Sequence, residues 1–273
     1  MSKNTPPTDA LIRELSHVAN LMADAAGAVI LPHFRSESLG AENKLEGGYD
    51  PVTVADHASE AAMRAILQQY RPDDGVLGEE MGSHEGTSGL TWVLDPIDGT
   101  RGFVAGTPTW GVLIAVGGPD GPFLGIVDQP YTGERFIGTP QGAMLVRGDD
   151  TRALRTRAAR PLSEAVLFTT FPEVGSTTEA AAFQSVAKQA QLVRYGMDCY
   201  AYALVASGQV DLVIEAGLHA YDIQGPLALI HAAGGIVTDW QGGPAHNGGR
   251  VLAAANREIY AEALALLSQA AVS

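Results

Sequence analysis

The stretch TWVLDPIDGTRGF, residues 91–103, places two acids where the backbone has little freedom to separate them. The apolar run before Asp95 predicts the end of a strand. Pro96 favours extended backbone at Asp95, and Gly99 permits a tight bend directly after Asp98. Two ionised carboxylates a few ångströms apart repel each other, and one becomes protonated unless a cation lies between them. The stretch therefore predicts a fold that brings a divalent cation to this strand end.

Other acids favour this interpretation over its simple alternative, a polar turn with Asp98 and Gly99 as turn residues. Glu79 and Glu80 follow a short predicted strand, and Asp222 follows the apolar run LVIE near a predicted helix start. Asp222 by itself is equally typical of a helix N-cap. Taken together, the acids predict one site built from several segments of the chain.

The ligand types indicate a hard cation. Carboxylates and the carbonyl oxygen of Ile97 offer oxygen alone, and none of the seven histidines has the spacing of a zinc motif. Such sites suit Mg²⁺, Mn²⁺ or Ca²⁺, and Mg²⁺ commonly completes its coordination with phosphate oxygens. The next residues, GTRGFVAG, predict a short helix whose N-terminal N–H groups favour an anion. There Gly99 permits close approach and Thr100 adds a hydroxyl.

The predicted elements change in order along the chain. Residues 1–150 form an α+β pattern, with two helices followed by strands with hairpin-like links, and residues 160–273 form an α/β pattern of alternating strands and helices. The charged segment 147–164 is the predicted boundary, and its basic run is expected to be a solvated surface. The expected helices are 9–30, 55–70, 178–190, 198–207, one through 227–233 and one from 256; the expected strands are 76–77, 92–94, 111–118, 121–130, 134–139, 142–148, 165–169, 191–195, 210–215, 236–239 and 250–255, with a polar loop at 81–89.

Composition limits the partners and the compartment. The chain has 273 residues, 46% of them hydrophobic, and a net charge of -14, which argues against nucleic acid or an anionic membrane as partner. Cys199 is the single cysteine, so no intrachain disulfide can form, which favours a reducing compartment. The N-terminus MSKNTPPTDA has no apolar segment, and no apolar run reaches membrane-spanning length. We therefore expect no signal peptide, no membrane span and a cytoplasmic location.

The assembled motifs resemble the inositol-monophosphatase superfamily of Mg²⁺-dependent phosphatases. The resemblance covers nearly the whole chain and implies a layered αβαβα sugar-phosphatase fold, which agrees with the α+β and α/β halves. Members are often homodimers, so a homodimer is expected. The matching motifs are LGEE (77–80), WVLDPIDGT (92–100), YDIQGPLALIHAAGGIVTDW (221–240), DPVTVAD (50–56) and AAAN (253–256).

The resemblance also implies a ligand set for two metal ions. Glu79, Asp95 and the Ile97 carbonyl would hold the first ion. Asp95, Asp98 and Asp222 would hold the second, with Asp95 bridging the two. The expected ions are Mg²⁺, two or three per site, with Mn²⁺ as the alternative.

The same resemblance implies a two-metal, in-line attack of water on phosphorus. The expected catalytic residues are Glu79, Thr100, Asp56 and Asp98. Asp56 and Thr100 would orient and deprotonate the water, and the second ion would stabilise the leaving alkoxide.

Within the superfamily, PTWGVLIAV (108–116), GIVDQP (125–130) and residues 194–218 resemble the histidinol-phosphatase branch, which acts in histidine biosynthesis. L-Histidinol phosphate carries an ammonium group, which Asp198 and Glu215 would attract more than a neutral polyol. The alternatives are an inositol monophosphatase or a nucleotide-3′-phosphate phosphatase, with a non-catalytic metal or phosphate sensor disfavoured because the expected ligands are present. The expected substrate-binding residues are Asp98, Gly99, Thr100, Arg194, Asp198, Glu215 and Asp222.

Several of these residues have structural alternatives. Asp198 is also typical of a helix N-cap, and Arg194 of a surface strand. Tyr200 and Tyr202 could flank an imidazole, but they are more typical of core or interface packing. The pair Gly225-Pro226 departs from the family pattern and is expected to delay or tighten the helix start after Asp222. Whether residues 36–50 close over the substrate stays open.

Overall fold

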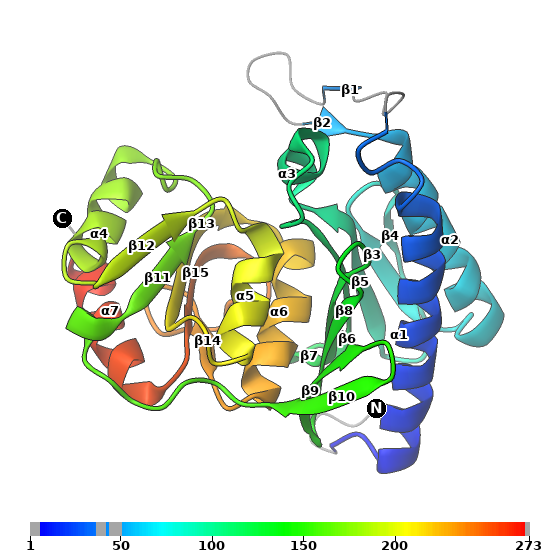
Figure 1. The fold of residues 1–273 in the computed structure, drawn as a ribbon. Helices are drawn as coiled ribbons and strands as arrows, with labels where there is room; N and C mark the ends of the chain where they lie inside the picture. The colour runs from blue at the N-terminus through cyan, green and yellow to red at the C-terminus, as the bar shows by residue number, and fades with distance from the viewer. Residues whose placement is uncertain (1–5, 37–41, 44–50, 271–273) are drawn as a thin grey trace.

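The computed structural model describes residues 6–36, 42–43 and 51–270, and the chain folds into five layers (Figure 1). Two sheets alternate with three pairs of helices in the order αβαβα, as predicted. Helices α5 and α6 fill the space between the sheets, and the pairs α1/α2 and α4/α7 cover their outer faces. Most of the segment 36–50 lies outside the described residues, so whether it closes over the substrate stays open.

The larger sheet has eight strands in the order β10-β9-β8-β7-β6-β5-β3-β4 and is antiparallel except for β3 and β5. Its central strands are buried on both faces: Leu113 and Val127 face the α5/α6 layer, and Ile114 and Ile126 face the α1/α2 layer. The strands are β3 (Gly75–Gly78), β4 (Gly82–His84), β5 (Thr91–Asp98), β6 (Gly111–Gly118), β7 (Gly121–Gln129), β8 (Glu134–Thr139), β9 (Gly142–Arg147) and β10 (Asp150–Leu154).

The smaller sheet has the order β12-β11-β13-β15-β14. Strand β11 is parallel to β12 and β13, and β15 is antiparallel to β13 and β14. A two-stranded sheet of β1 (Glu42–Asn43) and β2 (Pro51–Val52) lies apart. The strands of the smaller sheet are β11 (Val166–Thr169), β12 (Leu192–Tyr195), β13 (Leu212–Leu218), β14 (Ile236–Thr238) and β15 (Gly249–Ala254).

Several helices begin at residues whose side chains cap them, among them α1, α2 and α4. The Thr8 hydroxyl accepts from the Leu11 N–H at the start of α1, and Ser176 and Glu179 form a capping box at α4. The helices are α1 (Asp9–Ile30), α2 (Val54–Tyr70), α3 (Thr100–Ala105), α4 (Thr177–Ala187), α5 (Asp198–Ala206), α6 (Ala220–Ala232) and α7 (Arg257–Ala270), with a 3-10 turn at Leu162–Glu164.

Three sequence predictions need correction. Strand β4 lies inside the predicted polar loop 81–89, and β10 lies inside the predicted boundary segment, where it extends the larger sheet. Both are short, exposed edge strands, which lack the apolar pattern of a buried strand. The strand predicted to stop at Asp95 continues to Asp98 with an irregular register. The division of the chain into halves at residues 150 and 160 stays a prediction.

Helix α6 passes unusually close to the larger sheet. The Gly125 and Gly138 positions have no room for a Cβ, because it would collide with the backbone of Gly225 and Leu229 respectively. The helix begins at Ala220, and Pro226 lies inside it, so the expectation of a delayed start after Asp222 was wrong. Asp222 therefore lies in the first turn of a helix that is packed directly on the sheet.

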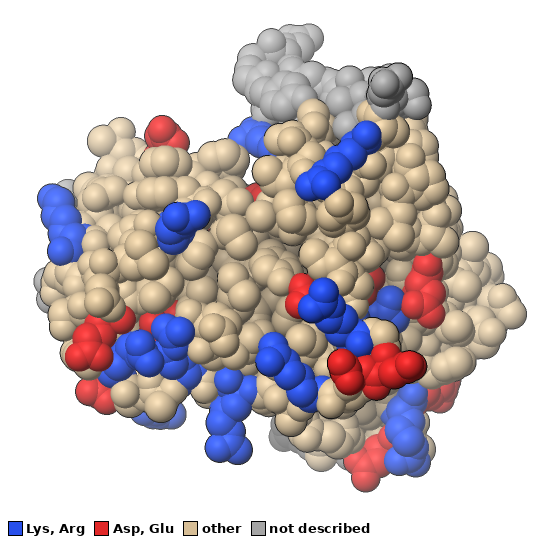
Figure 2. All heavy atoms as spheres, in the orientation of Figure 1, with Lys and Arg blue, Asp and Glu red and all other residues tan. Residues whose placement is uncertain are grey.

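The face of the molecule drawn in Figure 2 carries many basic side chains although the chain is acidic overall. On the face drawn in Figure 2, lysine and arginine side chains are frequent in the lower half, and the two lobes are separated by a notch at the top. Arg157 and Arg160 of the basic run approach Asp211 at 2.8 and 3.5 Å, so the run is partly paired rather than fully solvated. Among the described residues, no helix combines the length and apolarity needed to cross a bilayer.

Candidate active site

The end of β5 carries the two acids of the DPIDGT motif on one side of the sheet. In a regular strand, residues three apart point to opposite faces. Here Asp95 pairs with Leu113 and Asp98 pairs with Gly111, so the register shifts between them. We attribute the approach of the two carboxylates to this irregularity, which follows from Pro96 and from the left-handed Gly99 at φ +81°.

Asp222 completes a cluster with these two acids. Oxygen atoms of Asp95, Asp98 and Asp222 lie within 4.8 Å of one another. Asp222 comes from the first turn of α6, where its Oδ2 accepts the His219 N–H at 2.6 Å. The close packing of α6 on the sheet thus brings an acid from the second half of the chain to the end of β5.

Glu79 lies next to this cluster because of strand pairing. Strand β3 runs parallel to β5, and the Glu79 N–H donates to the Leu94 carbonyl at 3.2 Å, directly before Asp95. The Glu79 side chain forms a hydrogen bond with Asp95. The structure therefore brings together all four acids that the sequence predicted as ligands.

The electrostatics of the cluster call for a cation. Burial raises the pKa of Asp95 well above its ordinary value, and the neighbouring acids raise it further. Burial likewise raises the pKa of Asp98, and the charges of Asp222 and Asp198 add to the effect. A divalent cation would relieve this repulsion, and the oxygen-only donors fit a hard ion such as Mg²⁺.

Behind the cluster, Asp56 and Thr100 form a polar chain with the Ile97 carbonyl. The Thr53 N–H and hydroxyl donate to Asp56 Oδ2 at 2.8 and 2.5 Å, which fixes that carboxylate. Thr100 Oγ1 lies 3.4 Å from Asp56 Oδ1 and 3.0 Å from the Ile97 carbonyl oxygen. Burial raises the pKa of Asp56, so it is a better proton acceptor than an exposed aspartate.

The cluster opens into a cleft of about 320 Å³ that also contains both predicted specificity acids. Glu215 is 6% exposed and accepts the Thr170 N–H at 2.7 Å and the Thr169 hydroxyl at 3.1 Å. Burial raises the pKa of Glu215 to about 7. Asp198 accepts the Thr109 hydroxyl at 3.2 Å, and burial raises its pKa to about 6. These two acids therefore titrate near neutral pH.

Asp198 is not the helix cap that its sequence position suggested. Met197 occupies the N-cap of α5, and Asp198 has a left-handed backbone at φ +45°. This conformation directs the Cys199 N–H toward Asp98, whose Oδ2 accepts it at 2.6 Å. Because Gly99 has no side chain, Asp198 can pack against it. Asp198 therefore joins α5 to the DPIDGT turn.

The structure does not bring the remaining predicted residues to the cleft. Arg194 is exposed on β12 and does not line it. Tyr200 donates its hydroxyl to Glu134 at 2.6 Å, and Tyr202 is buried in the core between the sheets. For both tyrosines, the packing alternative is confirmed.

Sequence reasoning missed an aromatic rim on the cleft. Phe171 is 45% exposed there, and the Arg101 guanidinium carbon lies 4.9 Å from the centre of its ring. On another wall, the rings of His219 and Tyr221 stack at 5.0 Å. The signal for Phe171 was its position just after β11, since ligands bind at the carboxyl ends of parallel strands.

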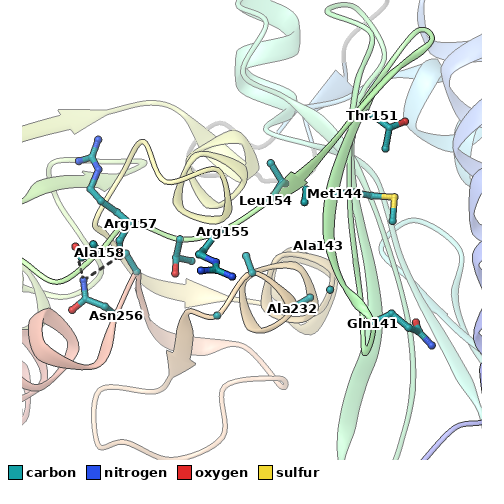
Figure 3. A pocket seen from close by; sticks show the side chains of 16 residues that line it. Gln141, Ala143, Met144, Thr151, Leu154, Arg155, Arg157, Ala158, Ala232 and Asn256 are labelled. Carbon is teal, nitrogen blue, oxygen red and sulfur yellow. Dashed lines mark hydrogen bonds between the residues drawn. The ribbon is translucent and has the colours of Figure 1, made fainter.

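A larger hollow of about 830 Å³ lies away from these acids (Figure 3). It is bordered by the β9–β10 hairpin, the end of α6 and Asn256, whose amide donates to the carbonyls of Arg157 and Ala158. Among the described residues that line it, none is Asp, Glu or His. It therefore lacks the groups for metal binding or acid–base chemistry.

Comparison with known proteins identifies the family. A model of the inositol monophosphatase family matches residues 11–272. The chain belongs to this family. It is a metal-dependent phosphomonoesterase, and its Asp95, Asp98 and Asp222 cluster is consistent with the metal site of inositol monophosphatases.

Similar members of the inositol monophosphatase family differ in their named substrates. The Arabidopsis thaliana protein "Bifunctional phosphatase IMPL2, chloroplastic" is 41% identical over 86% of this chain and 67% of its own length. The Streptomyces coelicolor "Histidinol-phosphatase" is 32% identical over 92% of this chain and 96% of its own length. The structure of an inositol monophosphatase from Zymomonas mobilis is 36% identical and superposes with a TM-score of 0.83, over 94% of this chain and 98% of that one.

Proposed function

We propose that this protein is an Mg²⁺-dependent L-histidinol-phosphate phosphatase. The observation that carries the proposal is the pair Glu215 and Asp198, which adds one buried and one half-buried acid to the cleft next to the metal cluster. The similarity to a protein named histidinol-phosphatase supports the same substrate. The two ions would be held by Glu79, Asp95 and the Ile97 carbonyl, and by Asp95, Asp98 and Asp222.

Bound Mg²⁺ would lower the pKa of a water molecule and offset the charge that develops on the phosphate and leaving oxygen. The protein's own contribution is to place and deprotonate that water. Thr100 Oγ1 accepts a hydrogen bond from the water, and Asp56 accepts the proton through the Thr100 hydroxyl. Gly99 and Thr100 at the start of α3 would contact the phosphate, and Asp98 and Asp222 would hold an ion next to it.

In the reaction, the water oxygen attacks phosphorus and the ester P–O bond breaks on the opposite side. The leaving alkoxide takes up a proton to give histidinol, and inorganic phosphate is the second product. Catalysis arises from positioning and charge stabilisation, as in other phosphoryl transfers.

The other end of the substrate accounts for the specificity. Ionised Glu215 attracts the ammonium group of histidinol phosphate, and Asp198 adds a second negative charge. Phe171 offers an aromatic surface on which an imidazole ring can stack, whereas a polyol gains little from it. The contact of Arg194 with phosphate is not part of the proposal, because Arg194 does not line the cleft.

Inositol monophosphate is the second candidate, favoured by the 36% identity to the Zymomonas mobilis inositol monophosphatase. The deciding experiment measures phosphate release from L-histidinol phosphate and from inositol 1-phosphate, each with Mg²⁺ and with EDTA. We expect kcat/KM for histidinol phosphate to be at least about tenfold higher, and activity to require Mg²⁺. The opposite preference would reject the substrate, and EDTA-resistant hydrolysis would reject the mechanism.

A further inference from the structure

We infer that Glu60, a residue to which the sequence analysis gave no role, positions the turn that carries the metal ligand Glu79. The inference rests on the proposed function, because it concerns the same metal site. Glu60 lies on α2 and is 0% exposed. A buried carboxylate is costly unless it is paired and hydrogen-bonded, so its partners show what it holds in place.

Those partners are the backbone of the turn between β3 and β4. Glu60 Oε2 accepts the Glu80 N–H at 2.7 Å, and Oε1 accepts the Met81 N–H at 3.1 Å. Both N–H groups follow Glu79 directly in the chain. The Glu60 side chain therefore accepts hydrogen bonds from two N–H groups of the turn. This fixes the shape of the turn.

The turn is built around this carboxylate. A Cβ at Gly78 would collide with the Glu60 carboxylate, so a side chain at position 78 and Glu60 cannot occupy the same space. On its other side, Glu60 is paired with Arg64, whose Nε donates to Oε1 at 2.8 Å. Arg64 also donates to the Gly82 carbonyl at the far end of the turn.

Glu79 is thus held from both sides along the backbone. Its own N–H bonds to Leu94 of β5, and the next two N–H groups bond to Glu60. This arrangement fixes the orientation of the Glu79 side chain, which points toward Asp95. Removing a group that orients a metal ligand typically lowers metal affinity or activity about ten- to a hundredfold.

The test is Glu60→Gln, which keeps the size of the side chain but replaces one acceptor oxygen by a donor. We expect the dissociation constant for Mn²⁺, titrated without substrate and followed by electron paramagnetic resonance, to rise at least about tenfold. In the metal-free protein, amide hydrogen exchange of a peptide spanning residues 79–82 should become faster. Arg64→Gln, which leaves Glu60 in place, should give a smaller change in the same direction.

Glu179→Gln is the matched control. Glu179 also accepts a backbone N–H, from Ser176 at 2.7 Å, and pairs with an arginine, Arg250 at 2.7 Å, but it lies at the start of α4. This variant should keep wild-type Mn²⁺ binding, and circular dichroism should show that all variants are folded.

Two results would overturn the inference in different ways. Wild-type Mn²⁺ affinity and exchange in Glu60→Gln would reject the positioning role and leave the proposed phosphatase function standing. A wild-type protein that binds no Mn²⁺ would reject both, because there would be no metal site to position. An equal loss of Mn²⁺ binding in Glu179→Gln would show a general loss of stability and also reject the specific role.

Discussion

At the scale of single residues, the site is defined by acids placed where burial and mutual repulsion make them unstable as anions. The pKa values of Asp95 and Asp98 are raised by burial first and by neighbouring charges second. The specificity acids Asp198 and Glu215 lie further out in the same cleft, with pKa values raised to about 6 and about 7. The same physical cause, burial, therefore acts on the acids of the candidate metal site and on those of the proposed substrate site.

Replacing Asp95 should lower activity without lowering thermal stability. Asp95→Asn removes the acid expected to bridge both ions, so we expect Mg²⁺-dependent phosphate release to fall at least about a hundredfold. The same change removes one charge from a repelling, buried cluster, so Tm in EDTA should be at or above that of the wild type. Phosphate-release assays and thermal unfolding measure both effects. Full activity in this variant would contradict the metal mechanism.

Glu215 predicts the pH dependence of substrate selection. Its raised pKa of about 7 means that the carboxyl is neutral below that pH and ionised above it. Attraction of the substrate ammonium should therefore weaken as the pH falls from about 8 to about 6, and KM for histidinol phosphate should rise. In Glu215→Gln, KM should be high and lack this change. Identical pH profiles of KM for both proteins would contradict the role of Glu215.

At the scale of elements, the position of α6 determines where Asp222 lies. The helix touches the sheet through glycines, and Pro226 lies within it, one residue after the contact glycine Gly225. Helix α2 likewise positions two acids, Asp56 and Glu60, on the other side of the larger sheet. The positions of Asp222 on one side and of Asp56 and Glu60 on the other are therefore set by how two helices pack in the fold.

Gly125→Ala tests the role of this close packing. The added Cβ would collide with the Gly225 carbonyl, and overpacking of this kind typically costs about 1–3 kcal/mol. We expect a lower Tm and weaker Mg²⁺ binding, because α6 and Asp222 must move outward. Gly118→Ala is the control, since the nearest atom to its Cβ would be the Gly89 oxygen at 3.9 Å. Equal Tm values for the two variants would exclude tight packing as the cause.

At the scale of the whole molecule, the cleft lies where the two sheets and the middle helices meet. Its acids come from both sheets and from α5 and α6, so the geometry of the cleft depends on how the layers are stacked. The net charge of -14 favours cations over polyanions near the protein, and the expectation of no nucleic-acid partner stays a prediction. The homodimer and the cytoplasmic location stay predictions.

Metal binding should therefore stabilise the whole fold. We propose that the folded protein binds Mg²⁺ and the unfolded chain does not, so Tm should rise with Mg²⁺ concentration. At a hundred times the dissociation constant, the gain in unfolding free energy should be about 2.7 kcal/mol. EDTA should reverse the rise. Differential scanning calorimetry, with NaCl at matched ionic strength as control, measures the effect. An equal rise with NaCl would indicate charge screening instead of a specific site.

The sequence by itself determined the ligand types, the αβαβα fold and the family. DPIDGT, Glu79 of LGEE and Asp222 were enough to predict the ligand types, because the backbone limits at Pro96 and Gly99 are local. The family and its αβαβα fold followed from the resemblance of the motifs. Tertiary structure decided what depends on packing between distant segments. The exposed edge strands β4 and β10 lack the apolar pattern of a buried strand. The left-handed Asp198 and the buried Glu60 have no local signal, since the groups they position or bind, Asp98 and the Glu80 and Met81 N–H groups, are at least 20 residues away in the chain.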